Sequence, residues 1–153
     1  NTLMTSHSED IVNKWGIINF DNVKEETKDI VSEFDVRTPT LDNAAASLSG
    51  GNLQKFVIGR EILKKPRVFV VNQPTWGVDA AAAAFIRQSI LNLASHDSAV
   101  VVISQDLDEL FEICDTFAVL TNGRLSKSYD IRSLSSEDVG LLMGGSDLDL
   151  KNP

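Results

Sequence analysis

Two short runs of β-branched residues, separated by a stretch with helical spacing, constrain the fold of this chain most strongly. The runs span residues 68–71 and 100–103, and each is continuous rather than alternating. Such runs are typical of strands that are buried on both faces of a parallel sheet. Residues 80–94, which lie between them, place four apolar side chains on one side of a helix: Ala82, Ile86, Ile90 and Leu93. The pattern predicts a βαβ unit in an α/β fold, with a mainly parallel sheet flanked by helices.

Two helices are predicted before the first strand. Residues 21–34 carry apolar side chains at steps of three and four, which indicates an amphipathic helix with an exposed polar face. A second helix begins after the N-cap residue Ser49, runs to about Lys64 and stops before Pro66. We expect its apolar side chains to face inward: Leu53, Phe56, Val57 and Ile62.

The last third of the chain carries its own turn and cap signals. A helix is predicted from Asp106, and a third strand is predicted over residues 116–120. The Asn-Gly pair at 122–123 is a strong hairpin signal and folds that strand back onto residues 125–129. A capping-box pattern at residues 135–138 begins a last short helix. We therefore expect a C-terminal β-hairpin and a terminal helix after the βαβ unit.

Composition excludes several classes of function. The formal net charge is -8 and the sequence has no basic stripe, which argues against binding to nucleic acid or to anionic lipid. No apolar run approaches the ~20 residues that cross a bilayer, and no signal peptide opens the chain. The single cysteine, Cys114, is expected in the core, whereas His7 and His96 lack partners at metal-binding spacing. We expect a soluble domain without a metal site, and the first residue, Asn1, suggests a piece of a longer protein.

The segment from Ser49 to Lys55 has the chemistry of a phosphate clamp. Ser49 adds a hydroxyl donor, and Gly50 and Gly51 let the backbone of a helix N-terminus approach an anion. We expect the ammonium group of Lys55 to add positive charge. The phosphate-wrapping motif G-x-x-x-x-G-K-[ST] does not occur in the sequence. A clamp without that loop indicates half of a composite site.

Polar side chains follow both predicted strands of the βαβ unit. Asn72 and Gln73 end the first strand, Asp79 comes shortly after them, and Gln105 follows the second strand. Because ligands gather at the carboxyl ends of parallel strands, these residues are candidates for a site shared with the clamp.

The order and spacing of these segments resemble the nucleotide-binding domains of ATP-binding-cassette (ABC) transporters over residues 41–129. Leu48-Ser49-Gly50-Gly51 resembles the signature motif of that family, and residues 68–73 resemble its Walker B strand. Residues 77–79 resemble the D-loop, and Gln105 stands where a switch histidine is usual. Alone, a Ser-Gly-Gly segment is more often a helix cap with a flexible loop. The downstream pattern favours the signature motif.

Within the family, the sequence is most similar to the second half of the ATPase subunit of a simple-sugar or nucleoside importer. Active members end the Walker B strand in Asp-Glu, whereas this chain has Asn72-Gln73, and Gln105 replaces the histidine. An amide brings no negative charge to Mg²⁺ and takes up no proton at neutral pH. The resemblance therefore implies that the site on this half is catalytically degenerate and that the chain alone has no ATPase activity.

The resemblance also implies a composite ATP site. In the family, each ATP lies between the P-loop of one domain and the signature motif of the other. We expect Ser49, Gly50, Gly51, Asn52 and Asp79 to contact ATP in trans, with Mg²⁺ held by the partner half. The implied partners are that half and a membrane permease, at the cytoplasmic face of the inner membrane. Two alternatives remain open, namely a non-transport ABC ATPase and a structural or regulatory interaction module.

Four regions are expected along the chain. Residues 1–47 form part of a helical subdomain, and residues 48–64 form the signature-motif helix. Residues 65–145 form the α/β ATPase core, and residues 146–153 form a polar tail. Because the strand that carries the P-loop is missing, we expect an uncovered strand edge or apolar face. The isolated chain should then self-associate or cover that surface with its N-terminal segment.

Overall fold

The structure is a computed structural model that describes residues 2–5 and 16–145. The described residues up to Ile103 form one compact unit and those from Ser104 onward form a second, so each unit is described by itself. The predicted polar tail, residues 146–153, lies outside the described residues. In the described part of the chain, no helix has both the length and the apolarity that crossing a membrane requires.

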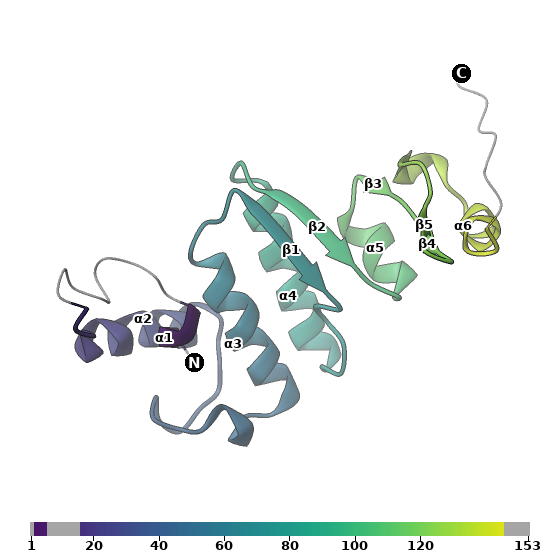
Figure 1. Ribbon diagram of the computed structural model, residues 1–153. Coiled ribbons are helices and arrows are strands. Elements are labelled where there is room, and N and C mark those ends of the chain that lie inside the picture. Colours follow the sequence, from purple (N-terminus) through teal and green to yellow (C-terminus); the bar gives the residue numbers. More distant parts are fainter. Residues whose placement is uncertain (1, 6–15, 146–153) are drawn as a thin grey trace. The chain divides into compact units, whose positions relative to one another are not determined.

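The centre of the first unit is the predicted βαβ arrangement. Strands β1 (Val68–Asn72) and β2 (Ala99–Ile103) pair in parallel, with Val70 opposite Val101. Helix α4 (Ala80–Ala94) connects them and packs on one face of the pair (Figure 1). Its buried residues are those that the helical spacing predicted: Ala82, Ile86, Ile90 and Leu93.

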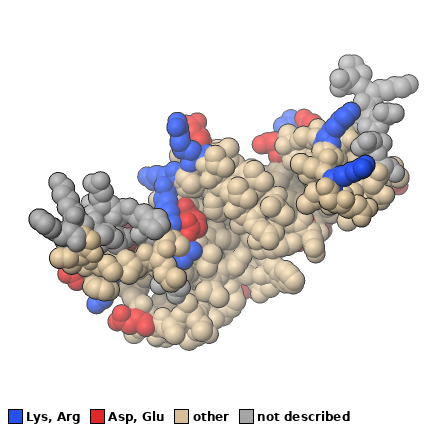
Figure 2. Space-filling view, in the orientation of Figure 1, with Lys and Arg blue, Asp and Glu red and all other residues tan. Residues whose placement is uncertain are grey.

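The prediction that both strands are buried on both faces is wrong. Phe69 faces α4 and is 7% exposed, whereas Val68 and Val70 on the other face are 64% and 60% exposed. On the same uncovered face, Val101 and Ile103 of β2 are 49% and 52% exposed. The surface over β1 and β2 is mostly uncharged (Figure 2). The structure thus confirms the expected uncovered apolar face, because among the described residues of this unit a helix covers only one face of the parallel pair.

Helix α2 (Phe20–Glu33) and helix α3 (Gly50–Ile62) enclose a hydrophobic core in this unit. Asn19 caps α2 by accepting hydrogen bonds from two amides of its first turn. The core consists of Ile30, Phe34, Val36 and Phe56. A four-residue helix, α1 (Thr2–Thr5), and a short 3₁₀ helix (Ala45–Ser47) complete the unit. The amphipathic helix over residues 21–34 is thereby confirmed, with its apolar face against α3.

The buried side of α3 differs from the prediction. Phe56, Ile58 and Gly59 are buried, whereas Leu53 and Val57 are 36% and 37% exposed. The ring of Phe34 lies directly over Gly59, so the closest approach of α2 sets which side of α3 is covered. The 3.6-residue period then carries Leu53 and Val57 to the outer side of the helix.

The second unit contains two small antiparallel pairs. Strand β3 (Thr116–Phe117) pairs with β6 (Tyr129–Asp130), and β4 (Leu120–Thr121) pairs with β5 (Arg124–Leu125). The predicted hairpin is confirmed. Its turn residues have φ values of 48° and 74°, as a type I′ Asn-Gly turn requires. The predicted third strand is split in two, and at the split the amide of Val119 donates to the Ser126 hydroxyl at 2.9 Å rather than to a backbone carbonyl.

Two helices flank these strands in the second unit. Asp106 caps α5 (Leu107–Ile113), and Ser135 and Asp138 form the predicted capping box of α6 (Ser136–Met143). A 3₁₀ helix (Ile131–Ser133) leads into α6. Cys114 is half-buried at the end of α5, and this burial, together with the nearby carboxylates of Asp115 and Glu109, raises the pKa of its thiol.

Candidate functional site

The N-terminus of α3 presents the predicted clamp on the surface of the first unit. Ser49 has extended backbone angles and caps the helix by accepting a hydrogen bond from the amide of Asn52 at 3.4 Å. Its side chain is exposed. The amides of Gly50 and Gly51 lie in the first turn, where no preceding carbonyl of the helix can accept from them. This end of α3 can therefore donate several hydrogen bonds to one anion.

Asn52 is bound at both ends of its amide within the chain. Its Nδ2 donates to Ser49 Oγ at 3.0 Å, and its Oδ1 accepts from the backbone amide of Arg37 at 2.9 Å. Asn52 is therefore hydrogen-bonded both to the N-cap serine of the clamp and to the segment before it.

The two clamp glycines lie against the loop that precedes α4. A Cβ atom on Gly50 would lie 3.3 Å from the carbonyl oxygen of Gly77, and one on Gly51 would lie 3.4 Å from Ala82 Cβ. The same Gly51 Cβ would lie 3.7 Å from Asp79 Oδ2, while Asp79 Oδ1 accepts from the amide of Ala82 at 2.9 Å. The structure thus brings residues 50–51 and 77–79 together. A side chain at Gly50 would require a small shift of the facing carbonyl, whereas one at Gly51 would make ordinary van der Waals contacts.

The end of β1 is tied to α3 by one side chain. Asn72 ends the strand and is exposed. Gln73 has a positive φ of 51°, and its backbone amide donates to the carbonyl of Ile103 at 2.8 Å. Gln54 Nε2 donates to the carbonyl oxygens of Pro74 at 2.9 Å and of Gln73 at 3.4 Å. This tether from α3 was not predicted, because a glutamine on a helix gives no sign of a partner about twenty residues away.

Lys55 does not add its charge to the clamp, which corrects the prediction. Its Nζ lies 3.2 Å from Asp35 Oδ2 and 5.0 Å from the centroid of the Phe85 ring. The residue is six positions after Ser49, which at 1.5 Å per residue is about 9 Å along the helix axis. Its ammonium group is therefore neutralised by Asp35, and the anion-binding capacity of the clamp comes from hydroxyl and amide donors.

Gln105 lies just beyond β2, among the first residues of the second unit, and its side chain is exposed. The amide of the next residue, Asp106, donates to Ser104 Oγ at 3.0 Å, so this short segment turns directly into α5. Among the described residues, no group of three His, Cys, Asp or Glu side chains could hold a metal ion.

Comparisons of the sequence with known proteins identify relatives but no family model. No protein-family model matches the sequence. A galactose/methyl galactoside import ATP-binding protein of Mannheimia succiniciproducens is 34% identical over 136 residues, covering 89% of this chain and 27% of that protein. A guanosine import ATP-binding protein of Bacillus subtilis is 33% identical over 146 residues, covering 95% of this chain and 29% of that protein.

Solved structures that share the fold of this chain include ATP-binding cassettes. A dimeric ATP-binding cassette in a post-hydrolysis state with ADP and Pi superposes with a TM-score of 0.67 at 16% identity, over 87% of this chain and 54% of that one. A nucleotide-free ATP-binding cassette from an ABC transporter superposes with a TM-score of 0.63 at 24% identity, over 86% and 50%. The chain belongs to the ABC family. It spans less than a third of the length of the two import ATP-binding proteins described above.

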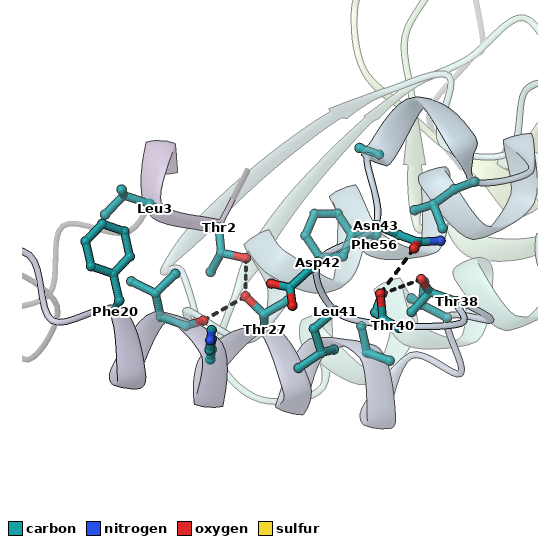
Figure 3. A pocket seen from close by; sticks show the side chains of 16 residues that line it. Thr2, Leu3, Phe20, Thr27, Thr38, Thr40, Leu41, Asp42, Asn43 and Phe56 are labelled. Carbon is teal, nitrogen blue, oxygen red and sulfur yellow. Dashed lines mark hydrogen bonds between the residues drawn. The ribbon is translucent and has the colours of Figure 1, made fainter.

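A groove of about 270 Å³ lies between α1, α2 and the segment before α3 (Figure 3). Thr2 and Thr27 share a hydrogen bond of 2.8 Å on one side of it. On the other side, Thr38 Oγ1 donates to the carbonyl of Thr40 at 2.8 Å, and Thr40 Oγ1 donates to Asn43 Oδ1 at 3.1 Å. The sequence did not predict this groove, because its walls come from segments that are far apart along the chain.

Proposed function

We propose that this ABC chain belongs to the ATP-binding component of an importer and contributes its clamp to a triphosphate carried by a second nucleotide-binding half. The clamp consists of Ser49, Gly50 and Gly51. The observation that supports this most is the contact between these glycines and the loop of residues 77–79, with the first turn of α3 left open to solvent. Both segments resemble interface motifs of the family.

The clamp has the donors that a phosphoryl group requires. Each hydrogen bond to a charged oxygen contributes about 1.5–3 kcal/mol. Two or three such bonds from the Ser49 hydroxyl and the glycine amides would hold two halves together while the triphosphate is intact. The helix dipole of α3 adds favourable interaction with negative charge.

The chain's own catalytic positions are substituted. The end of β1 does not fit a Mg²⁺ ion, because Asn72 and Gln73 supply neutral amides where a hard dication prefers anionic oxygens. Neither residue, nor Gln105, can act as a general base at neutral pH, and losing such a base costs about 10²- to 10⁴-fold in rate. We propose that Mg²⁺ and the catalytic base belong to the partner half and that this chain alone does not turn over ATP.

The names of the relatives indicate the class of cargo. Proteins named for galactose/methyl galactoside import and for guanosine import are both more than 30% identical to this chain. We therefore propose a simple sugar or a nucleoside as the transported solute and a membrane permease as a further partner. We also propose that this chain lies peripherally on the cytoplasmic face of the inner membrane. The predicted regions, with a helical part to residue 47, the helix of the clamp and an α/β core from residue 65, remain part of this proposal.

Transport by the assembled importer tests the proposal. Ser49→Arg should abolish uptake, because the long side chain fills the space that a phosphate would occupy. Ser47→Arg, two residues earlier on the same exposed segment, is the matched control and should retain uptake. Gln73→Ala should change uptake little, because the side chain is already unable to take up a proton.

Two results would contradict the proposal. Normal uptake with Ser49→Arg would show that the clamp does not approach a phosphate. Robust Mg²⁺-dependent ATP turnover by the 153-residue chain alone would show that the amides at the end of β1 support catalysis.

A further inference from the structure

We propose that Asn52 is a positioning residue that turns the hydroxyl hydrogen of Ser49 outward, so that Ser49 meets its ligand as a hydrogen-bond donor. This inference rests on the proposed function, since it concerns how the clamp engages a triphosphate. Asn52 was expected to contact the nucleotide itself. The hydrogen bonds of its amide assign it a different task.

The orientation of the Asn52 amide follows from its partners. The backbone amide of Arg37, 2.9 Å away, can only donate, so the atom that faces it must be the oxygen Oδ1. The opposite end of the amide is therefore the NH₂ group, and it lies 3.0 Å from Ser49 Oγ. Asn52 consequently donates to the serine and cannot accept its hydrogen.

Ser49 Oγ accepts two hydrogen bonds from the same residue. Besides the side-chain donor, the backbone amide of Asn52 donates to this oxygen at 3.4 Å. A hydroxyl group has two lone pairs and one hydrogen. With both lone pairs directed to Asn52, the hydrogen remains for an external acceptor, and the exposed position of Ser49 leaves it accessible.

The anchor of this arrangement, the backbone amide of Arg37, directly follows a residue of the core. Arg37 follows Val36, which is 5% exposed, and the amide of Val36 donates to the carbonyl of Val31 in α2 at 3.0 Å. The Asn52 amide therefore bridges the backbone of Arg37, an exposed residue next to the buried Val36, and the N-cap of α3. A serine hydroxyl that is already oriented loses less freedom when a ligand binds than one that rotates.

The consequence is selectivity for ligands that accept hydrogen bonds. Phosphoryl oxygens are acceptors only, and the adjacent amides of Gly50 and Gly51 are also donors. A group that must donate would find acceptors only in the neighbouring loop, at the Gly77 carbonyl oxygen and at Asp79 Oδ2, and not among the donors of the clamp itself. The site is thus preset for the fully ionised end of a triphosphate.

Steady-state ATP hydrolysis by the assembled importer, with MgATP as the probe, tests the inference through a double-mutant cycle. Ser49→Ala should lower kcat/KM about 10- to 100-fold, as the loss of a hydrogen bond to a charged group predicts. Asn52→Ala should lower it about tenfold in the presence of Ser49, within the range of couplings between contacting residues. In the Ser49→Ala background, Asn52→Ala should have less than about a twofold further effect, because no hydroxyl remains to orient.

The double-mutant cycle distinguishes orientation of the Ser49 hydroxyl by Asn52 from a purely structural role of Asn52. If Asn52 only tethers Arg37, Asn52→Ala will cost the same with and without Ser49, and that result would overturn the inference. Asn43→Ala is the matched control, because it removes a hydrogen bond from the same loop without touching Ser49, and it should leave kcat/KM unchanged.

A second variant covers the case in which Asn52→Ala does not fold. Asn52→Asp keeps an acceptor for Arg37 but accepts the serine hydrogen instead of donating to Ser49. Its added negative charge acts in both Ser49 backgrounds, so a larger loss with Ser49 present isolates the orientation effect, and equal losses would contradict it. The proposed function fails separately: if Ser49→Ala itself leaves kcat/KM unchanged, the clamp does not reach the triphosphate at all.

Discussion

Gly59 offers a sharp test of how α3 is held against α2. In an open helix, replacing glycine with alanine stabilises by about 1 kcal/mol, because alanine has the higher helix propensity. At Gly59, however, the new Cβ would lie 2.5, 2.6 and 2.9 Å from the Cγ, Cδ2 and Cδ1 atoms of Phe34. Carbon atoms are in favourable contact at about 3.5–4.0 Å, so the helix and the ring must separate by about 1 Å.

The ring has little room to move. Phe34 is 6% exposed, and it packs edge-on against Phe85 with 5.9 Å between the ring centroids. The atoms that collide include Cγ, which is fixed to the backbone through a single carbon and cannot rotate away as the tip of a side chain could. Overpacking of this kind costs about 1–3 kcal/mol, and the position of the clash favours the upper half of that range. After the gain in propensity, Gly59→Ala should destabilise the first unit by about 1–2 kcal/mol.

Gly140 in α6 is the matched control. It also lies inside a helix, but a Cβ atom there would meet nothing within 4 Å. Gly140→Ala should therefore stabilise its helix by up to about 1 kcal/mol. Native-state hydrogen exchange reports the opening free energy of each segment separately, so both effects can be measured in the 153-residue chain. If the amides of α3 become better protected in Gly59→Ala, the close packing of α2 on α3 described above is wrong.

Two further predictions concern the uncovered sheet face and the last helix. The 153-residue chain should self-associate in sedimentation velocity experiments. Val101→Glu should reduce this self-association, because Val101 is 49% exposed on the apolar face. A chain that is already monomeric without the substitution would contradict the reasoning. Hydrogen bonds from the side chain and the backbone amide of Ser135 lower the pKa of Asp138. The ionised carboxylate should therefore stabilise α6 fully at pH values above the ordinary aspartate pKa. This stabilisation should be lost as the pH falls through the lowered pKa of Asp138. An NMR titration should show the Asp138 pKa rising in Ser135→Ala, and an unchanged value would refute the capping box.

Features that depend on neighbouring residues were predictable from the sequence. The inward side of α4, the Asn-Gly turn of the hairpin and the Ser135 cap each follow from spacing or from a few adjacent side chains. The N-cap of α3 at Ser49 was predictable for the same reason, because a helix N-terminus and its cap are local features.

Features that depend on distant contacts were not predictable. Lys55 pairs with Asp35, twenty residues earlier, and the outer position of Val57 depends on where α2 crosses α3. Apolar strands such as β1 can be covered on one face or on both, and the residues themselves do not decide which. The orientation of the Asn52 amide likewise required the position of the Arg37 amide.

The hydrogen bonds of Gln54 attach α3 to the end of β1 without involving the side chain of residue 73. Gln54 binds the carbonyl oxygens of residues 73 and 74, which are present whatever side chain stands there. A carboxylate or an amide at residue 73 would therefore leave the attachment of α3 to this loop unchanged. A backbone attachment of this kind allows the side chain at residue 73 to vary during evolution while the position of α3 beside it is preserved.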